Sequence, residues 1–288
     1  MSTPDELAPY VVTTHNHATD SENRMHSDEV AQQFGFAGAL VPGVTVFAHM
    51  TYPLVQAFGE RWLGRATGEV RLLKPAYDGD RLNIHSEAAG DGYVVDCRNE
   101  AGVLLARLTT SMPERSAPPD PRWRTTPAPT NPPRCEIAER NIQLDQALAA
   151  HAETIGADAN QALAHSVADD LPIWRKDAGD ILATPLHPLW LASSCNQAFM
   201  RVWEMPSWIH AGTVFTLHRP LRIAQRIEQR TIPIRKWAHK GHEFATLYLA
   251  WLVDGEVAAE AQHTAIYTIA PPRTENERKP NGRLDRAL

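Results

Sequence analysis

An internal repeat is the feature that most restricts what this 288-residue chain can fold into. Residues 68–90 read GEVRLLKPAYDGDRLNIHSEAAG, and residues 212–234 read GTVFTLHRPLRIAQRIEQRTIPI. The matched positions lie 144 or 145 residues apart throughout: Val70 and Val214, Leu72 and Thr216, Pro75 and Pro220, Arg81 and Arg226, Leu82 and Ile227. A repeat of this length predicts a duplicated domain.

Each half continues with two β-rich runs around a turn. Residues 92–112 carry the turn Glu100-Ala101-Gly102, and residues 242–269 carry Asp254-Gly255. Asp-Gly between two such runs is a strong hairpin signal. Apolar and polar residues alternate after both turns, which indicates strands with one buried face. Each half is therefore predicted to contain several antiparallel strands.

An apolar segment precedes the strands of each half. Residues 43–58 read GVTVFAHMTYPLVQAF, and residues 187–203 read HPLWLASSCNQAFMRVW. A helix with apolar side chains on every side must be buried on every side, and a curled antiparallel sheet wrapped around it would bury it. We therefore predict an α+β protein of two hotdog domains, in which each curled sheet wraps one long buried helix. The two sheets are expected to pair edge to edge as an internal pseudo-dimer.

The two halves are separated by a proline-rich segment. Residues 113–133 read PERSAPPDPRWRTTPAPTNPP and contain eight prolines. Because proline lacks an amide donor and favours extended neighbours, we expect a semi-rigid strap with neither helix nor inner strand. Trp123 either pins this strap to a domain surface or lies exposed. The predicted division is an N-terminal hotdog carrying the site (1–112), a linker (113–140), a non-catalytic C-terminal hotdog (141–271) and a tail (272–288).

Composition excludes several classes of partner. A net charge of -6 argues against nucleic acid or an anionic membrane surface, and no apolar run could span a bilayer. The start, MSTPDELAPY, has no signal-peptide pattern. The three widely spaced cysteines, Cys97, Cys135 and Cys195, favour a cytoplasmic location. No phosphate-binding glycine motif or metal-ligand motif is present, since HNH at 15–17 lacks a third ligand, so no cofactor and no metal are expected.

The segment 21–50, SENRMHSDEVAQQFGFAGALVPGVTVFAHM, carries the functional signal. It resembles the signature of the MaoC-like, (R)-specific enoyl-CoA hydratase family, Asp-x-Asn-Pro-x-His followed by Gly-Phe and a turn that opens the buried helix. The elements that match are Asn23, His26, Asp28, Gly35, Phe36 and Gly43, with Pro42 at the usual histidine of the turn. The match is close over residues 21–60 and extends loosely over the chain as a double-hotdog dehydratase layout.

The resemblance implies roles for these residues. His26 would be the acid/base and Asn23 would organise the loop. The backbone N–H groups at the helix start, at Gly43 and Val44, would receive the negative charge of an enolate oxygen, because the helix dipole is positive there. Thr51 stands where the family often places a serine that orients the active-site groups.

One position departs from the family pattern. The signature aspartate lies five residues before the histidine, and here that residue is Ser21. Its neighbours Asp20 and Glu22 are acidic, but a shift of one residue in an extended segment points a side chain to the opposite face. Three outcomes are open: a bulge brings one of these carboxylates into the site, His26 works alone or with Ser21, or the site no longer adds water.

Other polar residues allow two interpretations each. We interpret three histidines of the second half as structural residues in preference to members of a second site: His187, His210 and His242. Basic residues along the matched strands would either be solvated or bind the phosphates of CoA or of a carrier's phosphopantetheine; they are Arg71, Lys74, Arg81, Arg219, Arg222 and Arg226.

The sequence thus predicts a hydro-lyase acting on acyl thioesters, which hydrates an enoyl-CoA or dehydrates a 3-hydroxyacyl-CoA in fatty acid metabolism. The expected partners are an acyl-CoA or acyl-carrier thioester and, at a leftover sheet edge, a second copy of the chain as a homodimer. A thioesterase on the same fold, or a non-catalytic protein that binds acyl thioesters, are the alternatives.

Overall fold

A computed structural model describes residues 5–175 and 183–271, in which all the main strands join one ten-stranded sheet. The strands of this sheet are β1 Tyr10–Thr13, β2 Thr67–Leu72, β3 Arg81–Ala89, β4 Gly92–Asn99, β5 Leu104–Ser111, β7 His151–Thr154, β9 Ile209–Leu217, β10 Arg226–His239, β11 His242–Val253 and β12 Glu256–Thr268. A separate pair is formed by β6 Cys135–Glu136 and β8 Trp203–Glu204.

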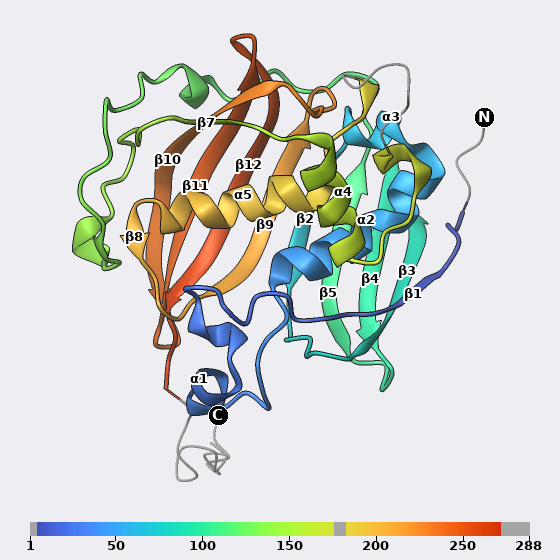
Figure 1. Ribbon diagram of the computed structural model, residues 1–288, viewed down its shortest axis with the longest axis horizontal. Coiled ribbons are helices and arrows are strands. Elements are labelled where there is room, and N and C mark those ends of the chain that lie inside the picture. Colours follow the sequence, from blue (N-terminus) through green and yellow to red (C-terminus); the bar gives the residue numbers. More distant parts are fainter. Residues whose placement is uncertain (1–4, 176–182, 272–288) are drawn as a thin grey trace, which may run out of the picture.

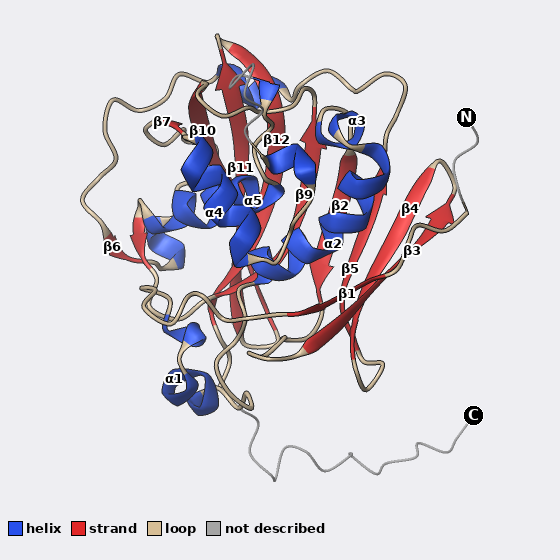
Figure 2. Ribbon diagram, turned by 45° about the vertical axis from the view of Figure 1, so that its right-hand side comes forward, coloured by secondary structure: helices blue, strands red, loops and turns tan. Residues whose placement is uncertain are grey.

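The longer helices lie on one face of this sheet (Figures 1 and 2). The helices are α1 Asp28–Gln33, α2 Gly43–Phe58, α3 Glu60–Leu63, α4 Ala157–Ser166 and α5 Pro188–Met200, with short 3-10 turns at Arg24–His26, Pro121–Arg124, Glu139–Asn141 and Pro172–Trp174. Helix α2 begins and ends where its apolar pattern predicts, and it continues through Pro53. Helix α5 begins one residue after His187, whose Nδ1 accepts a hydrogen bond from the Leu189 N–H and caps it.

The sheet has the order β1-β3-β4-β5-β2-β9-β12-β11-β10-β7, so β2 and β9 join the two halves at its centre. Their antiparallel register places Gly68 opposite Phe215 and Val70 opposite Thr213. Because Phe215 follows Val70 by 145 residues, each strand pairs with its own repeat around a local two-fold axis. The predicted edge-to-edge pairing of two helix-wrapping half-sheets is confirmed.

The repeat alignment itself needs one correction in these strands. Val70 is 1% exposed, whereas its proposed counterpart Val214 is 45% exposed. Phe215, at 3% exposure, occupies the equivalent inward position. The offset in β2 and β9 is therefore 145 rather than 144, because side chains alternate between the two faces of a strand.

Both predicted hairpins are present. Strands β4 and β5 pair around Glu100–Gly102, and β11 and β12 pair around Asp254 and Gly255. The φ angles of Asp254 and Gly255 are 55° and 78°. Two consecutive positive φ values are typical of a two-residue turn whose twist matches that of the flanking strands.

The proline-rich segment packs against the outer face of the C-terminal half-sheet. Trp123 contacts the cluster formed by Ile232, Tyr248, Ala250, Leu252 and Val257, and Arg230 donates a hydrogen bond to its carbonyl oxygen. This contact confirms that Trp123 pins the strap, and it explains why most of β11 is buried on both faces. The segment departs from the prediction in containing one 3-10 turn, and the short strand β6 follows it within the predicted linker, 113–140.

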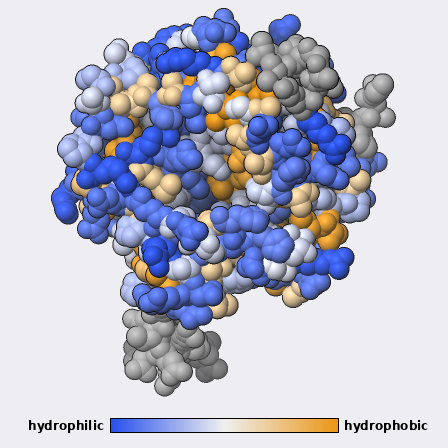
Figure 3. Space-filling model, in the orientation of Figure 1, coloured by the Kyte–Doolittle hydropathy of each residue, from blue (hydrophilic) through white to orange (hydrophobic). Residues whose placement is uncertain are grey.

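The view down the helical face shows a mainly hydrophilic surface with hydrophobic residues gathered near its centre (Figure 3). Among the described residues, no helix has the length and apolar character needed to cross a bilayer. The predicted tail, 272–288, lies outside the described residues.

We predict that Trp123→Ala lowers the free energy of unfolding by about 2 kcal/mol, because it removes a half-buried indole from the outer cluster. Urea unfolding would measure the change. Arg115→Ala, at an exposed position of the same segment, is the control and should change stability by less than about 0.5 kcal/mol. Equal effects of the two variants would show that Trp123 does not hold the strap.

Candidate active site

A cavity of about 240 Å³ lies where the two halves meet. Its walls come from the N-terminal loop, the start of α2, the end of β2 and the start of β9. The residues that line it are Asn23, Met25, His26, Phe36, Leu40, Val41, Pro42, Gly43, Val46, Leu72, Leu73, Lys74, Pro75, Ala76, Asn196, Trp208, Ile209, His210, Ala211, His242, Ile266 and Ile269. The lining is mainly apolar with a few converging polar groups, which is typical of a small-molecule site.

His26 lines this cavity, and its hydrogen bonds define which ring nitrogen carries the proton. Its Nδ1 lies 2.7 Å from the Leu40 carbonyl oxygen, which only accepts, so Nδ1 carries the proton of the neutral ring. Nε2 is then unprotonated, and the Asn23 amide donates to it at 3.3 Å. Burial lowers the pKa of His26, with the Leu40 carbonyl acting in the opposite direction. A neutral imidazole with an unprotonated ring nitrogen is suited to accept a proton.

Asn23 fixes the loop against the other half of the protein. Its Oδ1 accepts from the backbone N–H groups of Met25 and Trp208, at 3.3 and 3.2 Å. Its Nδ2 donates to the Trp208 carbonyl oxygen at 3.0 Å as well as to His26. With four hydrogen bonds, this 4%-exposed side chain has little freedom to rotate, and it sets the position of His26 relative to β9.

Among the described residues, the hydrogen-bond partners of the His26 ring are Asn23 and the Leu40 carbonyl oxygen, and neither is a carboxylate. Ser21 Oγ accepts a hydrogen bond from the Asn23 N–H at 3.0 Å, and thus stabilises the loop. Glu22 is exposed and forms an ion pair with Arg134, and Asp20 is exposed. None of these three residues lines the cavity, and the described lining contains no Asp or Glu.

Gly43 opens α2 at the cavity wall, and only glycine fits there without movement. A Cβ on Gly43 would lie 2.2 Å from Leu72 Cδ1 and 3.1 Å from His210 Nδ1. The first N–H groups of a helix have no intrahelical partner, so the N–H groups at Gly43 and Val44 are available at the positive end of a 16-residue helix. The Val44 side chain instead packs against Ala48 and Leu189 of the helix pair.

Thr51 lies away from the cavity. Its hydroxyl donates to the Ala48 carbonyl oxygen at 2.8 Å inside α2, and the residue is 1% exposed. It does not line the cavity, so a role in orienting a ligand there remains only a prediction of the family resemblance.

Eight cavity residues come from the second half, and four of them carry a polar side-chain atom. These four are Asn196 of α5, Trp208 immediately before β9, His210 in β9 and His242 at the start of β11, and none of them was predicted as a site residue. His210 is 5% exposed, and burial lowers its pKa to about 4 against a smaller opposing effect of the Gly212 backbone. Its inward orientation depends on a β-bulge, because Thr264 pairs with Gly212 but Ala265 pairs with His210, leaving Ala211 as an extra residue.

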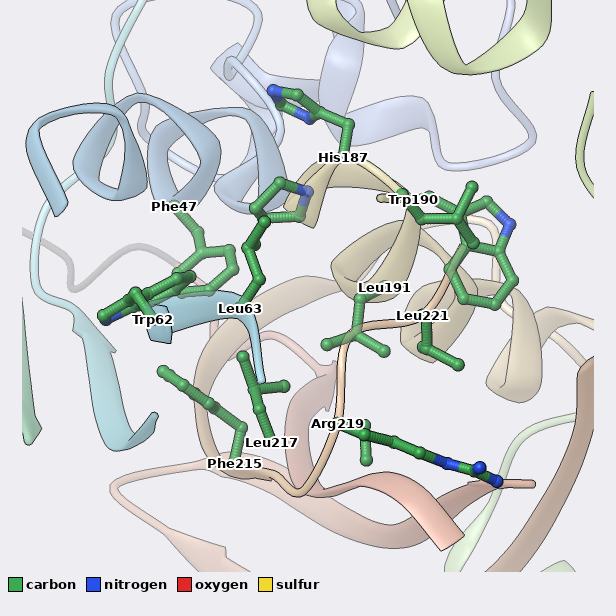
Figure 4. A pocket seen from close by; sticks show the side chains of 13 residues that line it. Phe47, Trp62, Leu63, His187, Trp190, Leu191, Phe215, Leu217, Arg219 and Leu221 are labelled. Atoms are coloured by element: carbon green, nitrogen blue, oxygen red, sulfur yellow. The ribbon is translucent and has the colours of Figure 1, made fainter. Parts of the chain in front are cut away.

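The place related to this site by the two-fold axis is filled. There, residues of α2, α3, α5 and β9 enclose only about 30 Å³. Figure 4 shows Phe47, Trp62, Leu63, Leu217 and Trp190 converging on it from both halves. Pro188 occupies the position 145 residues after Gly43, and proline has no N–H to offer a ligand. The geometry of the cavity is therefore unique to one side of the repeat among the described residues.

Of the basic residues considered as phosphate ligands, Lys74 is exposed and lines the cavity. Arg71 and Arg222 form ion pairs with Glu69 and Glu60, and Arg219 donates to the carbonyl oxygens of Val253 and Glu256. The structure thus brings one of these cations to the cavity.

Comparison with protein-family models gave no match, and neither did comparison with curated protein sequences. Among solved structures, a putative MaoC domain protein dehydratase from Chloroflexus aurantiacus J-10-fl is 13% identical with a TM-score of 0.59, over 93% of this chain and 95% of that one. A conserved hypothetical protein from Mycobacterium tuberculosis with a double hotdog fold is 12% identical with a TM-score of 0.58, over 91% and 96% of the two chains. The chain has a double-hotdog fold. Its structural neighbours include MaoC-like dehydratases, as residues 21–60 predicted.

We predict that this double-hotdog protein loses stability as the pH falls from about 6.5 towards 4. Burial lowers the pKa of His49 and of His210 to about 4 from the ordinary 6.5, so in this range the unfolded chain takes up protons that the folded chain excludes. Each histidine should cost roughly 2 kcal/mol between pH 7 and pH 5.

Urea unfolding of the protein and of His49→Leu at both pH values would measure this. The variant should show the smaller pH dependence, whatever its absolute stability. An unchanged pH dependence would contradict the burial of a neutral His49.

Proposed function

We propose that the protein is a hydro-lyase that reversibly adds water to a 2-enoyl thioester or removes it from a 3-hydroxyacyl thioester, at the cavity beside His26. The observation that carries the proposal is that His26, whose Nε2 is unprotonated, and Gly43, the first residue of α2, line the same largely apolar cavity. The N-terminal hotdog, 1–112, would supply these groups, and the C-terminal hotdog would supply the opposite wall.

The chemistry requires a base and a site for negative charge. His26 Nε2 takes a proton from water as its oxygen bonds to the β-carbon, and the electrons of the double bond move to the thioester oxygen as an enolate. The N–H groups at Gly43 and Val44 hold that oxygen. His26 then returns the proton to the α-carbon, which completes the addition of one water molecule.

Two features support an acyl thioester as the ligand. The cavity wall is largely apolar, as an acyl chain requires, and the exposed Lys74 lies at the cavity where the phosphates of a CoA or carrier arm could bind. The filled two-fold equivalent supports the assignment of the C-terminal half as a non-catalytic partner.

The lack of a carboxylate beside His26 favours one alternative, an acyl-thioester-binding protein without turnover. A family member normally holds the water between His and Asp. Here Ser21 stands at the position of that Asp, and its hydroxyl oxygen accepts a hydrogen bond from the Asn23 N–H within the loop. Thioester hydrolysis on the same fold is distinguished from both by release of a free thiol.

The direct test follows the conjugated-enoyl absorbance of short, medium and branched trans-2-enoyl-CoAs together with a thiol reagent. We expect loss of absorbance without thiol release, and at least about a hundredfold lower kcat/KM for His26→Asn. His85→Asn, a half-exposed histidine of β3, is the control and should keep full activity. Thiol release would identify a thioesterase, and no turnover with any thioester would identify a binding protein.

We further predict that Gly43→Ala weakens binding of a saturated analogue, butyryl-CoA, by about tenfold, because the new Cβ pushes Leu72 into the cavity. Leu72→Ala should restore space, so the double variant should recover much of the affinity. Calorimetric titration would measure all three variants. Undiminished binding to Gly43→Ala would place the ligand elsewhere.

A further inference from the structure

We propose that Trp208 and His210 bind a hydroxyl group on the acyl chain, with Trp208 Nε1–H donating to the hydroxyl oxygen and His210 Nδ1 accepting its hydrogen. Both would be specificity-determining residues, which position the substrate while His26 performs the proton transfers. This inference rests on the proposed function only in taking an acyl thioester as the ligand.

The first observation is a pair of unsatisfied polar atoms. Trp208 Nε1 and His210 Nδ1 are buried and have no hydrogen-bond partner among the described residues. The two side chains are 3% and 5% exposed, and both residues line the cavity. An unpaired buried polar atom is unfavourable, and a ligand that pairs it recovers this loss.

The second observation fixes which atom donates. Asn196 Oδ1 is 2.9 Å from His263 Nε2 and, as an amide oxygen, can only accept. Neutral His263 therefore accepts at Nδ1 from the Thr213 hydroxyl, at 2.7 Å. The Thr213 oxygen in turn accepts from His210 Nε2–H, at 2.8 Å.

This hydrogen-bonded chain leaves His210 Nδ1 without a proton. Burial and the nearby His210 ring lower the pKa of His263, and burial lowers that of His210, so both rings are neutral. No charged residue takes part in the chain to stabilise an imidazolium. His210 is thus a fixed acceptor and a poor base.

The location of His210 Nδ1 indicates from which group of the ligand it would accept a hydrogen bond. His210 Nδ1 is 3.1 Å from where a Cβ of Gly43 would lie, so it is next to the helix start that is proposed to hold the thioester oxygen. An indole N–H only donates and this imidazole nitrogen only accepts, whereas a hydroxyl does both. A hydroxyl a few bonds from the thioester carbonyl, as in a 3-hydroxyacyl chain, satisfies both atoms at once, whereas the saturated chain satisfies neither.

The test is equilibrium binding of 3-hydroxybutyryl-CoA and butyryl-CoA to the full chain carrying His26→Asn, which prevents turnover. We expect the hydroxylated ligand to bind about tenfold more tightly. His210→Phe and Trp208→Phe should each abolish this preference while butyryl-CoA still binds. The double variant should lose no more than either single variant, because both residues bind one group.

A matched pair of variants tests the hydrogen-bonded chain without altering the cavity wall. Thr213→Val removes the hydroxyl that orients His210 and should reduce the preference. Thr246→Val removes a similar buried hydroxyl, bonded to Thr264 Oγ1, and should leave it intact. This pair also decides the matter if His210→Phe does not fold.

Equal affinity of the parent protein for the two ligands, or a preference that survives both phenylalanine variants, would overturn the inference. Those results would leave the proposed function standing, since butyryl-CoA would still bind. Failure to bind either thioester would instead refute the proposed function.

Discussion

The antiparallel pairing of β2 with β9 is the contact on which the rest of the structure depends. It joins two half-sheets into one sheet, and it places α2 and α5 side by side on the same face (Figures 1 and 2). Because the strands run in opposite directions, the end of β2 meets the start of β9. The candidate site forms at that meeting point, so each half supplies one wall and neither half would form the cavity alone.

The two-fold relation between the halves also explains their difference. Each end of the β2–β9 pair could hold a cavity, but the residues at the two ends differ. At one end Gly43 leaves room and exposes N–H groups; at the other, Pro188 removes an N–H, and Trp62 and Trp190 fill the space. The repeat supplies two equivalent places at the ends of this strand pair, and among the described residues the side chains leave a sizeable cavity at one end of the pair and not at the other.

Much of the fold could be predicted from the sequence because it follows from local pattern. The apolar run 43–58 predicted the bounds of α2. Asp254-Gly255 predicted a hairpin turn, because only a few backbone conformations join two neighbouring strands with two residues. The site was predictable in part: the resemblance of residues 21–50 to the family signature singled out His26 and Asn23, and both line the cavity. His210 was assigned to structure, because its inward orientation depends on the bulge at Ala211, which reverses the alternation that a sequence pattern assumes. The contact of Glu22 with Arg134 could not be predicted from the sequence pattern either, because it joins residues more than a hundred positions apart.

The proposed function and the asymmetry of the two halves together require that one acyl thioester binds per chain, at the meeting point of β2 and β9. Calorimetric titration of the protein with butyryl-CoA tests it most directly, through the stoichiometry. One ligand per chain is expected, because the two-fold equivalent is filled. Two ligands per chain would contradict the asymmetry of the halves, and no binding would contradict the proposed class of ligand.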